Sequence, residues 1–124
     1  MAFSSTRTAC ALAFLLSSAV APSALAHAHL KQQSPAADSQ VAVAPQALTL
    51  QFSEGIEPAF SGVTVTSEDK QTIKTGAISL DDKDKTQLTV PLDQALSAGT
   101  YRVEWHVVSV DGHKTKGSYR FSVK

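Results

Sequence analysis

The stretch that decides the fold runs from residue 99 to residue 108 and reads Gly-Thr-Tyr-Arg-Val-Glu-Trp-His-Val-Val. Its polar and apolar side chains alternate with the period of two that is typical of a β-strand. The apolar face carries Tyr101, Val103, Trp105 and Val107. The opposite face carries Arg102, Glu104, His106 and Val108. The pattern predicts a long strand with one buried face and places Trp105 in the core.

Further short strands are predicted on both sides of this stretch. Asp111-Gly112 is a hairpin-type turn signal before a final strand over residues 118–123. Upstream, apolar alternation predicts strands near residues 48–52, 63–66, 73, 78–80 and 87–92. The charged run 81–85 fits a solvated turn. About seven strands with weak helix signals indicate an all-β fold, a small β-sandwich of antiparallel sheets.

The first 26 residues have the pattern of a secretory signal peptide. Arg7 precedes an apolar run over residues 9–16 and 19–21, and Ala24-Leu25-Ala26 forms a small-residue cleavage site. The apolar run is too short and too interrupted for a membrane anchor, which needs about 20 apolar residues. We therefore expect export through the Sec pathway, removal of residues 1–26, and a single soluble domain over residues 27–124.

Signal removal also decides which ligands remain. Met1 and Cys10 are the methionine and the cysteine of the chain, so the mature protein carries no sulfur ligand and no disulfide. Loss of Arg7 leaves ten basic against eleven acidic residues, a net charge near −1. This charge argues against a nucleic-acid partner, because nucleic-acid binding normally needs a basic patch.

The predicted cleavage makes His27 the first residue. A free α-amine and the ring Nδ1 of the same histidine can close a six-membered chelate around one metal ion, which a histidine inside the chain cannot do. The α-amine has a pKa of about 8, so its deprotonation costs little near neutral pH. Copper(II) prefers tetragonal nitrogen and oxygen ligands, and such a site suits it.

A second group of ligands is predicted at Asp111-Gly112-His113. Gly112 permits a tight turn that can aim a carboxylate and an imidazole at one point. By itself the tripeptide is a weak signal, because a loop histidine is usually solvated. His106 shares the polar strand face with Arg102 and Glu104, which favours a surface histidine that hydrogen-bonds within the sheet.

The mature chain resembles the CopC family, with most similarity to its YobA-type members. The matching segments are His27-Ala28-His29-Leu30, Ser34-Pro35-Ala36, Leu50-Gln51-Phe52-Ser53-Glu54, Gly99-Thr100-Tyr101 and Trp105 through His113. The resemblance implies a Greek-key sandwich, cupredoxin-like or immunoglobulin-like, in the periplasm. It also implies one copper(II) ion per chain, bound through the amine and ring of His27 with Asp111 and His113, and a CopD-like inner-membrane copper transporter as partner.

Two features leave the ligand set open. The better-known copper-resistance members carry a methionine-rich copper(I) site, and no methionine survives processing here. In addition, His29 stands third in the mature chain, so the amine, two deprotonated amides and its imidazole can chelate copper(II) by themselves. Because that arrangement ignores the fold, His29 ranks below the His27, Asp111 and His113 site and is kept as an auxiliary ligand.

These observations favour a copper(II) carrier or buffer, active in copper homeostasis or resistance, over an enzyme. One alternative is a β-sandwich interaction module with incidental histidines, since this architecture hosts many functions. The other is an oxidative copper enzyme of the N-terminal-histidine type. Such enzymes need an open copper face and a substrate platform, whereas Asp111 would occupy a coordination position and the aromatic residues are few.

Overall fold

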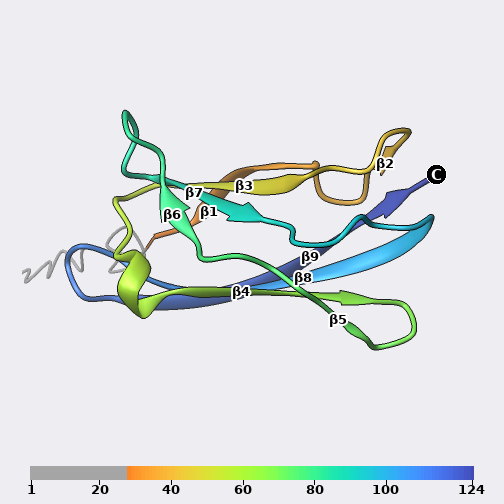
Figure 1. Cartoon of the computed structure of the whole chain (residues 1–124). Coiled ribbons are helices and arrows are strands. Elements are labelled where there is room, and N and C mark those ends of the chain that lie inside the picture. Colours follow the sequence, from red (N-terminus) through yellow and green to blue (C-terminus); the bar gives the residue numbers. More distant parts are fainter. Residues whose placement is uncertain (1–27) are drawn as a thin grey trace, which may run out of the picture.

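The computed structural model describes residues 28–124, so His27 and the predicted signal peptide lie outside the described residues. Two sheets face each other around one core (Figure 1). The first sheet has the order β1 (Leu30–Ser34), β3 (Ala47–Phe52), β7 (Gln87–Pro91) and β6 (Ser79–Leu80). The second has the order β2 (Gln40–Val41), β9 (Lys114–Val123), β8 (Gly99–Val108), β4 (Gly62–Ser67) and β5 (Thr72–Ile73). The predicted all-β sandwich is confirmed.

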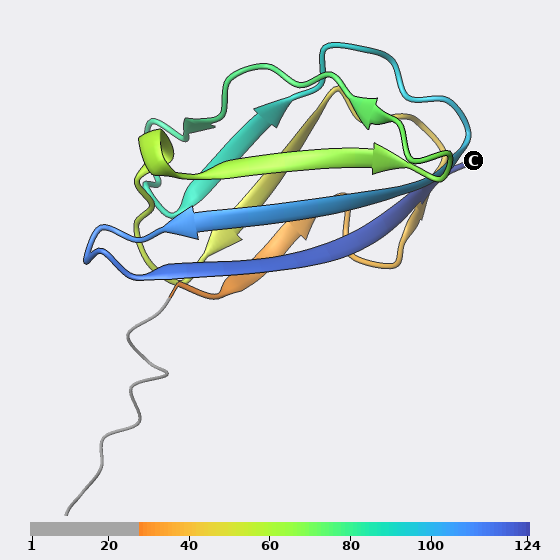
Figure 2. The same ribbon diagram turned by 90° about the horizontal axis from the view of Figure 1, so that it is seen from below.

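The β8–β9 hairpin is the longest feature of the second sheet. Its antiparallel register runs from Gly99 opposite Val123 to Val108 opposite Lys114, and residues 109–113 form the turn. Figure 2 shows β9, β8 and β4 side by side, with the turn at one end of the molecule. Burial alternates along β8 as the sequence predicts, because its apolar face covers the core and its polar face meets solvent.

Trp105 joins the two sheets. Its ring meets that of Phe52 on β3 edge to face, with centroids 5.1 Å apart and an interplanar angle of 73°. On its own sheet the ring lies against Gly117, where an added Cβ would approach the indole Cζ2 to 2.5 Å. A glycine is therefore required opposite Trp105, and this contact fixes how the start of β9 lies over the core.

The seven predicted strands correspond to β3 through β9, and the structure adds β1 and β2. Strand β1 has the sequence Leu-Lys-Gln-Gln-Ser with mostly exposed side chains, so it shows no apolar alternation. Strand β2 has two residues and pairs in parallel with the end of β9, which departs from the purely antiparallel expectation. Strand β9 begins at Lys114 rather than Ser118, because backbone pairing with β8 extends through its polar start.

Helical structure among the described residues is confined to η2 (Pro58–Phe60), a single 3-10 turn before β4. Across residues 28–124, no helix is long and apolar enough to cross a membrane.

Candidate metal site

Asp111 and His113 lie together on the turn between β8 and β9. The Nδ1 atom of His113 is 3.0 Å from Oδ2 of Asp111, and the two side chains are 44% and 42% exposed. Gly112 between them has a φ of +88°, a conformation that favours glycine. The predicted role of Gly112 is therefore confirmed: it lets the turn bring a carboxylate and an imidazole side by side within reach of solvent.

Ser109 holds this turn in place from its buried side. Its side chain is buried, and its hydroxyl donates a hydrogen bond to Oδ1 of Asp111. The backbone N–H of Ser109 donates to the carbonyl oxygen of His113 at 2.9 Å, and the N–H of Gly112 donates to the Ser109 carbonyl oxygen at 2.8 Å. The turn is therefore closed by several bonds centred on one buried residue.

The same contacts keep Asp111 ionised. The Ser109 hydroxyl, and after it the His113 imidazole, lower the pKa of Asp111 from 3.8 to about 2. A carboxylate is thus present at neutral pH, and a metal ion meets a negative oxygen ligand without having to displace a proton from Asp111.

The beginning of the described chain lies beside this hairpin. The Thr115 hydroxyl donates a hydrogen bond to the carbonyl oxygen of Ala28 at 3.0 Å. Ala28 itself is buried and belongs to the core. The next residue is tied to the end of β3, because the His29 N–H donates to Oγ of Ser53 at 2.8 Å and the Ser53 N–H donates to the His29 carbonyl oxygen at 2.9 Å. The chain is therefore anchored on both sheets from Ala28 onward.

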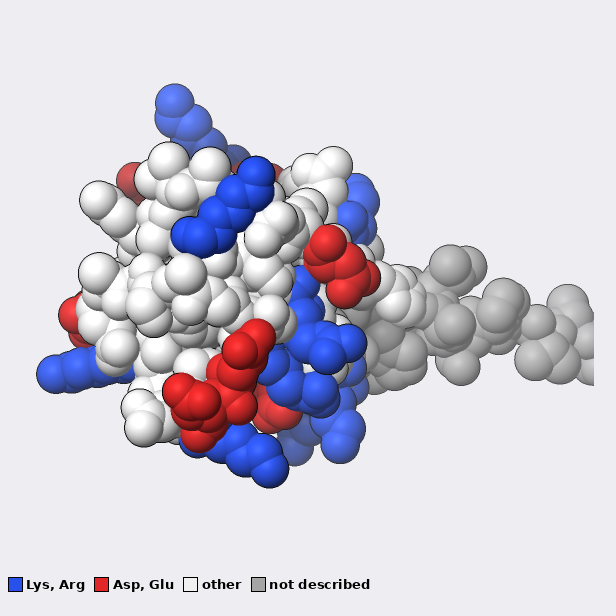
Figure 3. All heavy atoms as spheres, turned by 90° about the vertical axis from the view of Figure 1, so that its right-hand side faces the viewer, with Lys and Arg blue, Asp and Glu red and all other residues white. Residues whose placement is uncertain are grey.

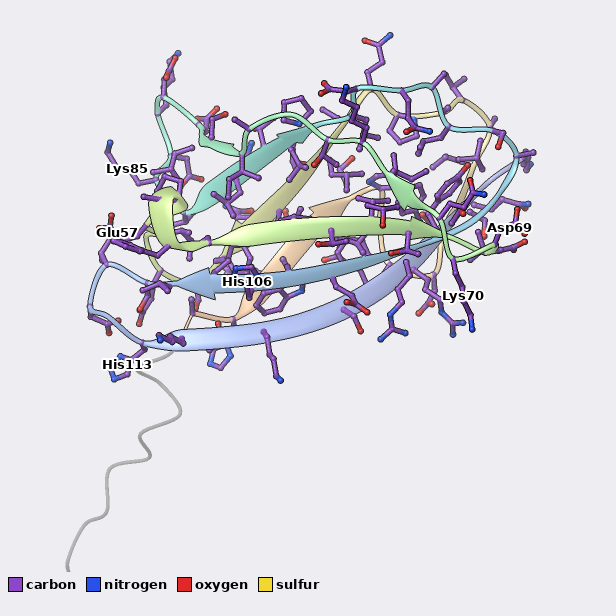
Figure 4. All side chains as sticks on the ribbon, turned by 60° about the horizontal axis from the view of Figure 1, so that its bottom comes forward. Glu57, Asp69, Lys70, Lys85, His106 and His113 are labelled. Carbon is purple, nitrogen blue, oxygen red and sulfur yellow. The ribbon has the colours of Figure 1, made fainter. Side chains whose placement is uncertain are left out.

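His106 lies apart from the turn, on the outer face of β8. It stands opposite Lys116 in the register and its ring covers Gly62, where an added Cβ would lie 2.5 Å from the ring Cε1. Figure 4 shows His113 near the turn and His106 farther along the sheet face. This arrangement agrees with the prediction of a surface histidine.

The geometry of the Asp111–His113 pair suits metal binding. Two ligand atoms that each lie about 2 Å from one ion, at a right angle, are about 3 Å apart, and Nδ1 and Oδ2 already have this separation. Within residues 28–124, however, no three His, Cys, Asp or Glu side chains gather into a group that could hold a metal ion. Among the described residues, the pair alone therefore does not complete a metal site.

Residues 30–124 match the CopC domain family. The chain belongs to the CopC family. The CopC relative Protein YobA of Escherichia coli K12 is 58% identical over 114 residues, which cover 92% of each chain. Among solved CopC structures, that of Methylosinus trichosporium OB3b has a TM-score of 0.74 at 32% identity and covers 79% of this chain and 94% of that one. PcoC from Escherichia coli, described as a methionine-rich copper resistance protein, has a TM-score of 0.71 at 36% identity, covering 79% and 99%.

Three residues that support the candidate site were not predicted from the sequence: Ser109, Thr115 and Ser53. Each holds a backbone segment or the Asp111 carboxylate in place. Serine and threonine are too common in strands and turns for this role to be visible in a pattern. Their position in the sequence could have indicated two of them, because Ser109 stands two residues before Asp111 and Thr115 two residues after His113.

Proposed function

We propose that the mature chain is a periplasmic copper(II) carrier or buffer that binds one ion through His27, Asp111 and His113. The observation that carries the proposal is the Asp111–His113 pair, exposed to solvent and preformed at 3.0 Å. Copper(II) heads the divalent affinity order and prefers nitrogen and oxygen ligands, which are the donor types of this pair. The ion would be bound by Nδ1 of His113 and Oδ2 of Asp111 together.

The anchoring of Ala28 supports His27 as the third residue of the site. Consecutive Cα atoms are about 3.8 Å apart, so His27 is tethered directly to a residue that is hydrogen-bonded to Thr115. Thr115 in turn follows His113 by two residues on the same strand. A free amine and ring at His27 would supply the two donors that Asp111 and His113 lack.

The alternative three-residue chelate through His29 is less compatible with these contacts. It requires the His29 amide nitrogen to lose its proton and bind copper, whereas that N–H donates to Oγ of Ser53. Binding in this mode would break the contact that holds the start of β1 against β3. We therefore keep His29 as an auxiliary ligand.

Our proposals of a periplasmic location and of a copper-exchange partner rest on membership of the CopC family. PcoC, to which this chain is 36% identical, is a copper resistance protein. A CopD-like inner-membrane copper transporter is the proposed partner, and it would give copper to the carrier or receive it.

An oxidative enzyme is a weaker reading of the same site. Among the described residues, Phe60 is the one large aromatic side chain that is strongly exposed, at 69%, while the Trp105 ring is buried. A flat aromatic platform for a polymeric substrate is therefore not provided by residues 28–124. An interaction module without a metal role would not require an ionised, preformed carboxylate–imidazole pair.

Titration of the copper-free mature protein with copper(II) tests the proposal, with the fluorescence of Trp105, the single tryptophan, as readout. We expect one equivalent to bind and His113→Ala to weaken affinity about 100-fold or more, because loss of a residue that only supports a ligand already costs about 10- to 100-fold. His29→Ala is the matched control and should change affinity only slightly. If His29→Ala abolished binding and His113→Ala did not, the three-residue chelate would be the site.

A further inference from the structure

The outward face of the β8–β9 hairpin carries mostly positive charge. Its outward positions on β9 carry Lys114, Lys116, Ser118, Arg120 and Ser122, and those on β8 carry Arg102, Glu104, His106 and Val108. The single acidic side chain among them, Glu104, is paired with Arg102 at 2.9 Å. On the neighbouring β4, the positions opposite β8 on this face are Gly62, Thr64 and Thr66. We call Lys114, Lys116 and Arg120 the basic stripe.

The basic stripe is not neutralised within the part of the chain that the structure describes. No carboxylate of residues 28–124 lies within ion-pair distance of Lys114, Lys116 or Arg120. Arg120 stands directly opposite Arg102 in the register, and like charges in that position repel. Such a face is unexpected in a mature chain with a net charge near −1, and it is complementary to an acidic partner.

An apolar groove adjoins the stripe at the end nearest the candidate metal site. It has a volume of about 420 Å³ and is lined by Phe60, His106, Val107, Val108, Lys114, Thr115 and Lys116. We call it the Phe60 groove. Phe60 projects into solvent because η2 ends there, and an exposed aromatic beside a groove is a common anchor of protein interfaces.

The wall that carries Phe60 is held firmly against β8. The Glu57 N–H donates to the Val108 carbonyl oxygen at 2.9 Å, and the Val108 N–H donates to Oγ of Ser61 at 3.0 Å. Lys114, on the other wall, directly follows His113. The groove is therefore preformed and continuous with the turn that holds the copper ligands.

We infer that the Phe60 groove and the basic stripe form the docking surface for an extended acidic protein segment of the copper-exchange partner, with an apolar side chain in the groove. Lys114 and Lys116 stand two residues apart, about 7 Å along a strand, and Arg120 stands four residues after Lys116. Carboxylates at alternate positions of an extended segment can match these spacings. A groove also receives a projecting side chain, which the surface of a lipid bilayer does not offer. This inference rests on the proposed carrier function, since it places the partner beside the copper ligands.

The opposite end of the molecule provides a matched control. Seen from that end, Asp and Glu side chains lie beside Lys and Arg side chains (Figure 3). There the β4–β5 turn carries Glu68, Asp69 and Lys70 in succession. Figure 4 shows Lys70 far from His113. Lys70→Glu changes the net charge as much as Lys116→Glu does, but outside the proposed surface.

The probe is a capped peptide of alternating glutamate and threonine with one central leucine, titrated into the copper-free mature protein and followed by amide NMR shifts. We expect the shifts to centre on Phe60, His106, Lys114 and Lys116. Lys116→Glu should weaken peptide binding about tenfold or more. Phe60→Ser, or serine in place of the peptide's leucine, should also weaken it, and Lys70→Glu should leave it unchanged.

Equal weakening by Lys116→Glu and Lys70→Glu would overturn the inference, because it would show attraction to net charge alone. Vesicles of phosphatidylglycerol that shifted the same amides and displaced the peptide would overturn it too, in favour of a membrane surface. Copper(II) affinity is measured on the same samples. An unsubstituted protein that failed to bind copper would defeat the proposed function, whereas intact copper affinity without site-specific peptide binding would defeat only the docking surface.

Discussion

The hydroxyl of Thr115 donates a 3.0 Å hydrogen bond to the carbonyl oxygen of Ala28, and this contact joins two segments that are 87 residues apart in the chain. Ala28 follows His27, and Thr115 stands two residues after His113. The bond therefore ties the predicted mature N-terminus to the hairpin that carries the other proposed ligands. This contact supports the proposal that a first-residue histidine and the Asp-Gly-His turn bind one metal ion.

Replacing Thr115 with valine should weaken copper(II) binding about five- to tenfold, because a hydrogen bond worth about 1 kcal/mol no longer positions the N-terminus. Thr115→Ser keeps the hydroxyl and should retain most of the affinity. In a protein with one residue added before His27, Thr115→Val should have no further effect. Competition titrations against a copper chelator measure all of these affinities. A loss that Thr115→Ser did not restore would show that the hydroxyl has no positioning role.

Replacing Ser109 with alanine should raise the pKa of Asp111 from about 2 toward 3.8, because the hydroxyl that stabilises its carboxylate is lost. A lowered pKa in the folded state gives stability that is present above pH 3.8 and is lost as pH falls toward 2. Ser109→Ala should remove this part of the acid sensitivity. Carboxyl carbon NMR of the copper-free protein follows Asp111 directly, and an unchanged midpoint would contradict the role given to Ser109.

The two tyrosines of the chain offer a matched pair of stability tests. The Tyr101 hydroxyl donates to the Ser97 carbonyl oxygen at 2.7 Å, so Tyr101→Phe should lower the free energy of unfolding by about 1 kcal/mol. The Tyr119 hydroxyl is buried without a hydrogen-bond partner in the described structure, so Tyr119→Phe should raise it by about 1 kcal/mol. Urea unfolding measures both, and equal losses would contradict the difference between the two sites.

Alkaline pH provides a second test of the burial of the Tyr119 hydroxyl. Burial raises the pKa of Tyr119 well above its usual value of 10. Below pH 10 the phenol is protonated in both the folded and the unfolded chain, so the shift does not change the free energy of unfolding. As pH rises above 10, the unfolded chain releases the proton first, and the free energy of unfolding falls. The free energy of unfolding should therefore fall less between pH 9 and pH 11 in Tyr119→Phe than in the unsubstituted protein. The same fall in both proteins would argue against a buried, protonated Tyr119.

The sequence predicted the core strands because their side chains alternate strictly, as Leu48, Leu50 and Phe52 do. Strand β1 escaped prediction because it lies at a sheet edge, where Lys31 and Gln32 face solvent and no apolar period is needed. Strand β2 escaped because it consists of two residues whose pairing depends on the distant end of β9. Edge strands are determined by tertiary contacts rather than by their own pattern.

For the candidate site, the sequence predicted the residue types and the turn but not the contacts that hold them in place. Gly112 indicated a turn, and in the structure Nδ1 of His113 lies 3.0 Å from Oδ2 of Asp111. The buried Ser109 and the Thr115–Ala28 bond became visible only in the folded chain, since they depend on long-range packing. The role of His27 remains a prediction that begins with cleavage after Ala26.

The most direct test of this central prediction compares copper(II) affinity between the mature chain starting at His27, with its N-terminus verified by mass spectrometry, and the same chain with one alanine added before His27. The added residue leaves all side chains in place but removes the free amine from His27 and with it the six-membered chelate. We predict that the extended protein binds copper(II) at least about 100-fold more weakly, as expected when a ligand is lost. Equal affinities would contradict the N-terminal site.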